Sequence, residues 1–441
     1  MAICLGYFMI ILDTTIVNIA LVNMQQQLGA SVNNLQWVVD GYTLVFASLL
    51  LTAGALGDRF GNKRVFLIGL ALFIFASALC GIAPTLWILE LVRLLQGIGA
   101  ALMLPASLAL LNTLSDDPRV RAKNIGIWGG IAGIGALSGP LVGGILVNAF
   151  GWRSIFLVNI PIGLLALALT WRFVMPVSSQ RQKSIDLLAQ ITGILALAAL
   201  TLACIQGNSW GWTSWPILVA FSIFVLATAS FILIERRSAS PMLPLKLFGS
   251  PAFSAATLVG LLLNFGFYGQ LFYISIYFQH VRGYSSLLAG LALMPETGMA
   301  IISSTLSGRL TAKTGPRLPM LIGLTLGGGS LLLLAFVGAT TSYGLLCLLL
   351  IAIGAGMSCT MPAMTTALLA SVPPERSAIA AGVLNASRQV GSVLGVAILG
   401  TLVDAGSSFM AGMHLASLLA GLAFLLGCVL TWRYVGTRKS R

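Results

Sequence analysis

The sequence predicts an all-α membrane protein, and three observations lead to this fold class. Of its 441 residues, 58% are hydrophobic and only 8% are charged, whereas about a quarter of a soluble domain is charged. Apolar runs of bilayer length also recur along the whole chain. Because a soluble enzyme keeps a polar shell and a disordered chain is poor in apolar residues, this composition excludes both classes.

Fourteen transmembrane helices are expected, since roughly 20 apolar residues in helical form cross a bilayer. Charged or glycine- and proline-rich breaks separate the apolar runs. The expected spans are residues 2–22, 37–56, 65–84, 86–110, 125–148, 155–175, 187–206, 214–234, 252–278, 287–307, 318–338, 343–363, 377–403 and 413–433.

Basic residues set the expected orientation. Twenty of the 24 lysines and arginines fall on one side of the membrane when both termini are placed in the cytoplasm. Only Arg153 and Arg282 fall outside, while Arg93 and Arg388 lie within spans. The positive-inside rule predicts this bias, so the net charge of +13 does not indicate nucleic acid. The first span begins almost at Met1 without the basic flank of a secretory signal, which is consistent with a natural start upstream.

An internal repeat relates the two halves of the chain. Residues 54–64 align with 308–318 at an offset of 254, and residues 97–106 align with 354–363 at an offset of 257. At an offset of 256, Gly126, Gly135, Gly139 and Gly144 align with Gly382, Gly391, Gly395 and Gly400. Matches at nearly one offset indicate a duplication, and the corresponding spans run in the same direction, as in parallel repeats.

The duplication divides the chain into three expected parts. Residues 1–175 form an N-terminal six-helix bundle and residues 251–441 form a C-terminal six-helix bundle. Residues 176–250 hold two extra transmembrane helices and linkers. The expected arrangement is therefore 6+2+6.

A short loop between the second and third spans combines glycines with charges. Its members are Gly54, Gly57, Asp58, Arg59, Gly61, Lys63 and Arg64. Glycine permits a tight turn, and the charges can pair with helix ends or with one another. The loop is therefore a candidate conformational switch that latches one state of a moving bundle. The alternative is an ordinary positive-inside loop.

The fifth span carries small residues at helical spacing. They are Gly135, Gly139, Pro140, Gly143 and Gly144. Small residues let two helices approach closely, and a proline permits a bend. Simple helix packing is one interpretation; a tight, kinked pair that prevents proton leak is the other.

These segments resemble motifs of the major facilitator superfamily, and of its fourteen-span drug:proton antiporter family of the multidrug efflux type. The segments are the loop at 54–64, LVRLLQGIGAA (91–101), GALSGPLVGG (135–144), LDTTIVNIAL (12–21) and GWRSIFLVNIPIG (151–163). They cover the chain in the family's order. Two positions depart from the pattern: Val22 stands where a proline often follows the first-span motif, and Ala312 replaces the acid of the second loop.

The resemblance implies a major facilitator fold and a transporter of the cell inner membrane. It implies a proton-coupled antiporter that exports hydrophobic, cationic drugs or toxic compounds by alternating access. Two alternatives stay open from the sequence. One is an exporter of an endogenous metabolite, such as an amino acid, a lipid or a siderophore. The other is a non-transporting receptor or scaffold with the same fold.

Charged residues inside spans are the main site candidates, because they are costly in a membrane. Asp13 and Arg93 both lie roughly 12–13 Å from the outer surface at 1.5 Å per residue, so an ion pair between them is geometrically possible. Asp40 and Glu296 are near-equivalent positions of the two halves. The full set for proton coupling and substrate binding is Asp13, Asp40, Arg93, Glu296, Arg388 and Asp404, with the polar residues Asn18, Gln96 and Tyr273. For each, the alternative is a structural pair or an interfacial charge.

The spans hold more acids than bases, which favours a cation as substrate. The ninth span adds aromatic side chains, which attract organic cations. The sequence has only two histidines and no clustered cysteines. We therefore expect no metal, no cofactor and no catalytic residue, and we do not expect an enzyme. The six cysteines are interpreted as buried thiols. The expected partners are a small-molecule substrate, protons and membrane lipid, and the sequence identifies no periplasmic adaptor.

Overall fold

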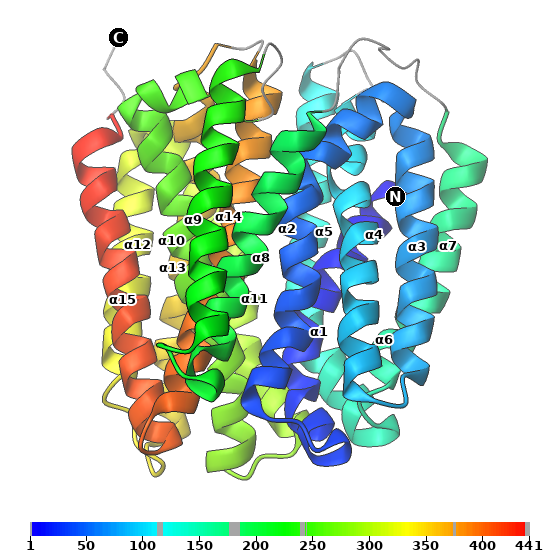
Figure 1. Cartoon of the computed structure of the whole chain (residues 1–441). Coiled ribbons are helices and arrows are strands. Elements are labelled where there is room, and N and C mark those ends of the chain that lie inside the picture. The colour runs from blue at the N-terminus through cyan, green and yellow to red at the C-terminus, as the bar shows by residue number, and fades with distance from the viewer. Residues whose placement is uncertain are drawn as a thin grey trace. The chain divides into compact units, whose positions relative to one another are not determined.

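Every element of the computed structural model is helical in the part of the chain that it describes (Figure 1). The described residues are 2–112, 118–175, 186–238, 243, 245–373 and 376–436. The helices are α1 (Ala2–Leu28), α2 (Val32–Phe60), α3 (Asn62–Ile82), α4 (Leu86–Asn112), α5 (Pro118–Phe150), α6 (Ser154–Leu157), α7 (Asn159–Phe173), α8 (Leu187–Trp210), α9 (Trp215–Arg237), η1 (Leu245–Gly249), α10 (Pro251–Ile276), η2 (Tyr277–Val281), α11 (Ser286–Thr314), α12 (Arg317–Leu334), α13 (Tyr343–Leu369), α14 (Ser377–Ala405) and α15 (Phe409–Tyr434).

These helices give the predicted membrane spans. Thirteen are long and apolar enough to cross a bilayer, and α2, bent by 54° between Leu50 and Thr52, makes up to fourteen. The predicted span 155–175 contains a break at Val158, which separates α6 from α7. Pro161 explains this break. It has no N–H to donate to the Leu157 carbonyl oxygen, and its ring clashes with that carbonyl group. The chain is thus an all-α, multi-pass membrane protein, as the composition predicted.

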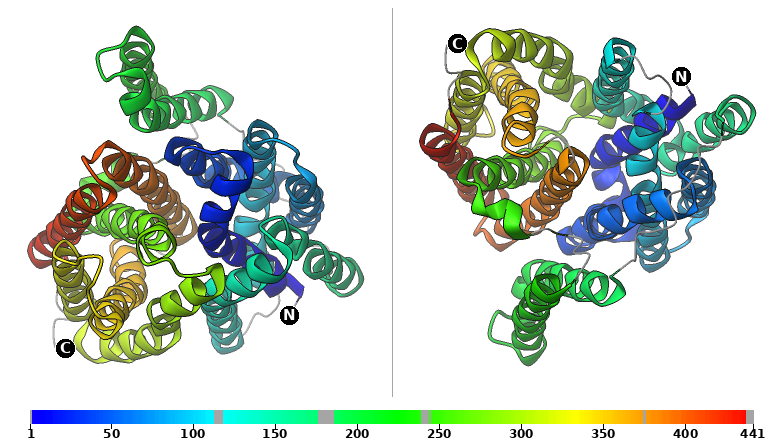
Figure 2. Two further views of the ribbon diagram at one scale, coloured as in Figure 1. Left: turned by 90° about the horizontal axis from the view of Figure 1, so that it is seen from below. Right: turned by 90° about the horizontal axis from the view of Figure 1, so that it is seen from above.

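The described residues form two compact units. The first comprises residues 1–197, 225–242 and 284–290, and the second comprises residues 198–224, 243–283 and 291–441. Helices α8 and α11 each contribute to both units. Figure 2 shows the helices of each unit end-on. The three-part division into 1–175, 176–250 and 251–441 stays a prediction.

Each unit contains the same close pair of helices. In the first unit, a Cβ atom on Gly69 of α3 would lie 2.8 Å from the carbonyl oxygen of Gly99 of α4, and a Cβ on Gly99 would lie 2.9 Å from that of Gly69. In the second unit, Gly323 of α12 and Gly356 of α13 have the same reciprocal relation, at 2.6 and 2.5 Å. These pairs are related by the repeat offsets, so the backbone packing is duplicated with the sequence.

A second duplicated pair involves the first and fifth helices of each unit. Gly135 and Gly139 of α5 pack against the backbone of α1, and Gly391 and Gly395 of α14 pack against the backbone of α10. The glycines of α14 meet only the backbone of Leu261 and Phe265, whereas those of α5 also meet the Thr15 side chain. In both pairs the missing side chain on glycine allows the close approach. This rigid framework positions the buried polar residues described next.

Candidate functional site

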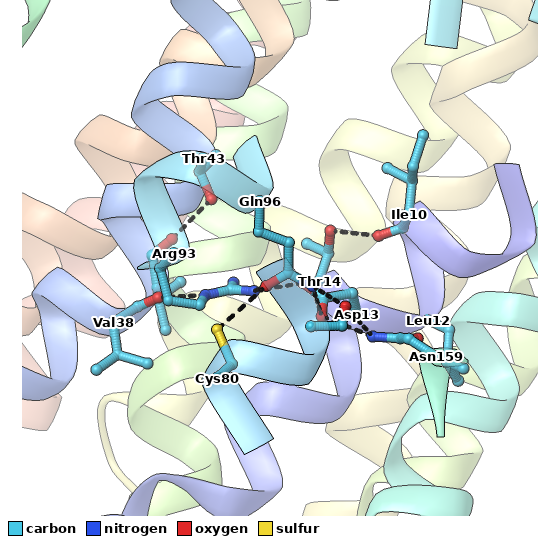
Figure 3. A network of polar contacts seen from close by, with 12 residues as sticks. Ile10, Leu12, Asp13, Thr14, Val38, Thr43, Cys80, Arg93, Gln96 and Asn159 are labelled. Carbon is cyan, nitrogen blue, oxygen red and sulfur yellow. Dashed lines mark hydrogen bonds and ion pairs between the residues drawn. The ribbon is translucent and has the colours of Figure 1, made fainter. Parts of the chain in front are cut away.

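A buried ion pair lies at the centre of the first unit (Figure 3). Asp13 comes from α1 and Arg93 from α4, and their Oδ2 and Nη1 atoms are 2.6 Å apart. Asp13 is 0% exposed and Arg93 is 1% exposed. It is the only ion pair found between two residues that the structure describes. The structure therefore brings together the two charges whose depths matched in the sequence.

Two amide groups complete the hydrogen bonding of the Asp13 carboxylate, and a hydroxyl group accepts hydrogen bonds from both amides. Gln96 Nε2 donates to Asp13 Oδ1 over 2.9 Å, and Asn159 Nδ2 donates to the same oxygen over 3.3 Å. The Gln96 carbonyl oxygen accepts from Arg93 Nη1 over 2.8 Å. Ser77 Oγ accepts from both amides, over 2.9 and 3.4 Å. We call Asp13, Arg93, Gln96, Ser77 and Asn159 the polar network.

The guanidinium of Arg93 is also held from the side of α2. Its Nε atom donates to the Val38 carbonyl oxygen over 2.9 Å. Its Cζ atom lies 4.3 Å from the centroid of the Tyr42 ring and 5.7 Å from that of Phe156. A buried charge pair is tolerated only when its remaining donors and acceptors are satisfied. Both oxygens of Asp13 and the Nε and Nη1 atoms of Arg93 are hydrogen-bonded, and the bonds join five helices of the first unit, α1, α2, α3, α4 and α7.

Sequence reasoning identified three members of the network and missed two. Ser77 and Asn159 were not singled out, although both are 0% exposed. Asn159 stands in an otherwise apolar run that the family resemblance had already marked. A buried amide in a span needs hydrogen-bond partners, which was the available signal. Ser77 gave no such signal, because serine is common in membrane helices.

Asp40 of α2 is buried without a cation beside it. It is 0% exposed. Neither carboxylate oxygen has a hydrogen-bond partner within the described part of the chain. Asp40 is thus separate from the polar network, although Tyr42 two residues later stacks on Arg93.

Glu296 of α11 is the corresponding acid of the second unit. It is 1% exposed. Gln270 Nε2 donates to its Oε2 atom over 3.5 Å, while its Oε1 atom has no partner among the residues described. A Cβ on Gly354 of α13 would collide with the Glu296 carbonyl oxygen, so the glycine lets α13 pack directly on this turn. Pro295 precedes Glu296 inside the helix and removes one backbone hydrogen bond there.

The other two charged candidates lie in different surroundings. Arg388 of α14 is partly buried; it donates to Asn385 Oδ1 over 3.3 Å and approaches Met361 Sδ at 3.7 Å. It forms no ion pair with the described residues. Asp404 is exposed in the last turn of α14.

The two remaining polar candidates differ in their contacts. Asn18 donates to the carbonyl oxygen of Thr14 over 3.0 Å, one turn earlier on α1, and lies outside the polar network. The Tyr273 hydroxyl hydrogen-bonds to Ser417 Oγ over 2.8 Å and is 0% exposed. Tyr273 therefore joins α10 to α15.

The loop after α2 has the tight geometry that its glycines predicted. Gly61 has a φ of +93°, which side-chain-bearing residues rarely adopt, and its N–H donates to the Gly57 carbonyl oxygen over 3.0 Å. Gly57 is buried beneath the Asn62 side chain. Gly54 lies near Pro105 of α4.

The charges of this loop differ in their surroundings. Lys63 Nζ donates to the Trp171 carbonyl oxygen over 3.0 Å, at the end of α7. Asp58 is partly buried, while Arg59 and Arg64 are exposed. The role of the loop as a switch stays a prediction.

The glycines of α5 lie on two faces of that helix. Gly135, Gly139 and Gly143 meet α1. Gly144 meets the backbone of residues 286–287, at the start of α11. Pro140 lies inside α5, and its carbonyl oxygen would collide with a Cβ on Gly290. The close approach that the glycine spacing predicted is therefore present, and a role in preventing proton leak stays a prediction.

The described residues include no cluster of three histidine, cysteine or acidic side chains that could hold a metal ion. The six cysteines are free thiols. Only Cys4, Cys80 and Cys204 are buried, and the other three are partly exposed. The expectation that all six are buried was therefore wrong, because an apolar run fixes depth in the membrane but not which face of the helix meets the bundle.

Fold and site together define a duplicated, multi-pass helical membrane protein with its polar chemistry buried among the helices. The chain belongs to the major facilitator superfamily, whose family model matches residues 3–396 and 297–441. This confirms the family predicted from the motifs.

Known proteins resemble the chain along its whole length. It is 38% identical to the methylenomycin A resistance protein of Streptomyces coelicolor, over 100% of this chain and 92% of that protein. It is 38% identical to the multidrug resistance protein Stp of Mycobacterium tuberculosis, over 93% of this chain and 76% of that protein. A solved POT family transporter in complex with 5-aminolevulinic acid superposes with a TM-score of 0.73 over 99% of this chain and 96% of its own. At 17% identity, this likeness concerns the fold alone.

Proposed function

We propose that the chain is a proton-coupled secondary transporter that exports hydrophobic, cationic compounds by alternating access. The observation that carries this proposal is the pair of buried carboxyl groups, Asp40 and Glu296, that no cation neutralises within the described residues. Such groups are costly in a membrane and are functional by default. The substrate class is supported by the relatives, whose names describe resistance to methylenomycin A and to multiple drugs.

Asp40 and Glu296 are the proposed carriers of proton and substrate charge. A carboxyl group can be a neutral acid or an anion, and burial without a cation makes the anion costly. In the proposed cycle, a proton taken from outside neutralises the acid and is released to the cytoplasm when the transporter opens inward. The anion then binds a cationic substrate, which leaves when the outward-open state is protonated again.

The polar network has a different proposed role. Asp13 already has a cation and two amide donors, so it is suited to holding a conformation rather than to meeting a substrate. Breaking and remaking the Asp13–Arg93 pair would couple protonation of Asp13 to movement of α1 against α4.

The proposed location is the cell inner membrane, with both termini in the cytoplasm. The distribution of basic residues supports this orientation. Protons then enter from the side of Arg153 and Arg282 and leave on the side of the loop at 54–64.

The test is ethidium efflux in proteoliposomes with an imposed pH gradient. Asp13→Asn, Asp40→Asn and Glu296→Gln are each expected to lose proton-driven efflux. Asp404 belongs to the predicted set but is exposed at the end of a span, so we do not propose it as a carrier, and Asp404→Asn is expected to keep proton-driven efflux as the matched control. Undiminished proton-driven efflux in both Asp40→Asn and Glu296→Gln would contradict the carrier roles. Proton coupling to an amino acid, lipid or siderophore but not to dyes would favour the metabolite exporter.

A further inference from the structure

The last turns of α7 and α15 carry one sequence with one set of contacts. Residues 170–174 read Thr-Trp-Arg-Phe-Val, and residues 431–435 read Thr-Trp-Arg-Tyr-Val. We call these two segments the TWR ends. In both, the valine is buried and its N–H donates to the carbonyl oxygen of the threonine, over 3.2 and 3.1 Å. Both threonines are 0% exposed.

A basic residue of the neighbouring loop contacts each TWR end. Lys63 donates to the Trp171 carbonyl oxygen in the first unit, and Arg317 donates to the Trp432 carbonyl oxygen in the second. Lys63 and Arg317 are equivalent at the repeat offset of 254. A cation at the C-terminal carbonyls of a helix is favourable. The carbonyl oxygen that each cation contacts belongs to the residue directly before Arg172 or Arg433, and the Cζ atom of Arg433 lies 5.5 Å from the centroid of the Tyr434 ring.

The tryptophan and the arginine of each TWR end are exposed, in contrast to the buried threonine and valine. Trp171 is 72% exposed and Trp432 is 66% exposed. Arg172 and Arg433 are also exposed. Tryptophan concentrates where the acyl chains meet the headgroups, and nearby arginine and lysine attract anionic lipids. Each TWR end therefore offers a tryptophan ring to the membrane interface. Its arginine and the cation that contacts it, Lys63 or Arg317, can attract a phosphate.

The cations keep donors for a ligand. Lysine has three N–H donors and arginine has five, while one contact with the tryptophan carbonyl oxygen is found for each of Lys63 and Arg317. The Cζ atom of Arg317 lies 4.5 Å from the centroid of the Trp432 ring. The Nε atom of Arg317 is buried, so the two Nη groups carry the donors for a phosphate. The geometry of the second unit thus holds the guanidinium beside the ring.

We propose that the two TWR ends are equivalent binding sites for the phosphate of an anionic membrane phospholipid, one in each unit. Lys63 and Arg172 form the first site, and Arg317 and Arg433 form the second. The ring of Trp171 or Trp432 lies against the glycerol region. This proposal does not depend on what the protein transports.

The loops beside the two sites differ at three charged positions. Asp58 and Arg64 of the first loop correspond to Ala312 and Leu318 of the second, and Arg309 of the second corresponds to Ala55. Residues 55–64 therefore have a net charge of +2 and residues 309–318 of +3. A carboxylate near the bases competes with a phosphate for them. The second site therefore binds the anionic lipid more tightly than the first.

Native mass spectrometry of protein purified with phosphatidylglycerol tests the proposal. Wild type is expected to retain two lipid molecules. Arg317→Gln/Arg433→Gln is expected to lose the tighter one, and Lys63→Gln/Arg172→Gln the weaker one. Arg236→Gln/Arg237→Gln removes two exposed bases from the end of α9 and is expected to retain both. Ala312→Asp is expected to weaken the second site while the first is unchanged.

Several outcomes would overturn the proposal. These are unchanged lipid retention in both TWR-end double variants, or an equal loss in the α9 control. Equal retention of phosphatidylcholine would show that the charge is not recognised. Displacement of the lipid by excess inorganic phosphate would indicate a free-anion site instead. Equal thermal unfolding of the variants in detergent shows that lost lipid does not reflect lost folding.

Discussion

The two halves of the chain share their backbone packing and differ in the side chains buried between the helices. At an offset of 257, Arg93 and Gln96 of α4 correspond to Leu350 and Ile353 of α13. At an offset of 254, Ser77 of α3 corresponds to Leu331 of α12. All of these side chains are at most 1% exposed. One half therefore has a hydrogen-bonded core where the other has an aliphatic one.

This difference shows which features the duplicated packing requires. The glycine contacts Gly69–Gly99 and Gly323–Gly356 recur because the helices could not approach otherwise. The polar network does not recur, so the fold does not need it. In the second half, the buried charge is Glu296, which lies on α11 rather than on the helices equivalent to α1 and α4. Polar chemistry has thus diverged on a constant framework.

The largest predicted loss of stability comes from removing one partner of the Asp13–Arg93 ion pair. Arg93→Leu copies the second half at that position but leaves Asp13 buried without a cation. Removing one partner of a buried ion pair costs about 3–5 kcal/mol. Thermal unfolding in detergent should show this loss, together with absent efflux in vesicles.

A matched variant separates charge from packing. Asp13→Asn/Arg93→Leu/Gln96→Ile removes both charges and copies Leu350 and Ile353, so it should recover most of the stability that Arg93→Leu loses. It should still fail to transport. If this triple variant exports ethidium normally, the network serves folding alone.

Larger residues at the duplicated helix crossings should cause a smaller loss of stability, of similar size in both halves. Gly139→Val places a side chain where the Thr15 side chain of α1 lies, and Gly395→Val places one where the Phe265 carbonyl group of α10 lies. Overpacking of this kind costs about 1–3 kcal/mol. Unfolding temperatures of the two variants measure it, and a large loss in one half only would show that the crossings are not equivalent.

The paired loop glycines should have a smaller effect again. Gly61 and Gly315 have φ values of +93° and +84°, a region that costs other residues roughly 1–2 kcal/mol. Gly61→Ala and Gly315→Ala should therefore destabilise the protein equally. Gly329→Ala, in a helix with nothing near its Cβ position, is the control and should be neutral or stabilising. A stable Gly61→Ala variant would argue against strain at this turn.

The smallest effect on stability is expected from Glu296→Gln, although its effect on transport is large. Glutamine is close in shape to glutamate and removes a buried charge that only Gln270 contacts among the described residues. The free energy of unfolding should hold or rise, while substrate-driven proton movement in proteoliposomes is lost. Loss of stability with normal proton movement would instead make Glu296 a structural residue.

Much of the fold could be predicted from the sequence because its signals are local. Apolar runs of bilayer length give the spans, and the glycines at fixed offsets give the duplicated crossings. The break before α7 was missed, although Pro161 was there to indicate it. Helix ends were also misplaced: α1 continues to Leu28 and α2 begins at Val32, because polar helical turns extend beyond the apolar run.

The candidate site was only partly predictable, since it depends on which helix faces meet. The depths of Asp13 and Arg93 made their pair possible, but depth could not show that Asp40 has no cation beside it. Asp404 lies at the outer end of its span, and the structure shows that its side chain is exposed.

By itself, the sequence determined that this protein crosses a membrane many times, that its halves are duplicated, and to which family it belongs. These properties follow from the apolar content, from repeat spacing and from motifs, which are carried along the chain. The tertiary structure decided which polar groups are neutralised and which remain as lone acids. The physical reason is that burial and hydrogen bonding act between helices distant in sequence, and their energies depend on contacts that no local pattern specifies.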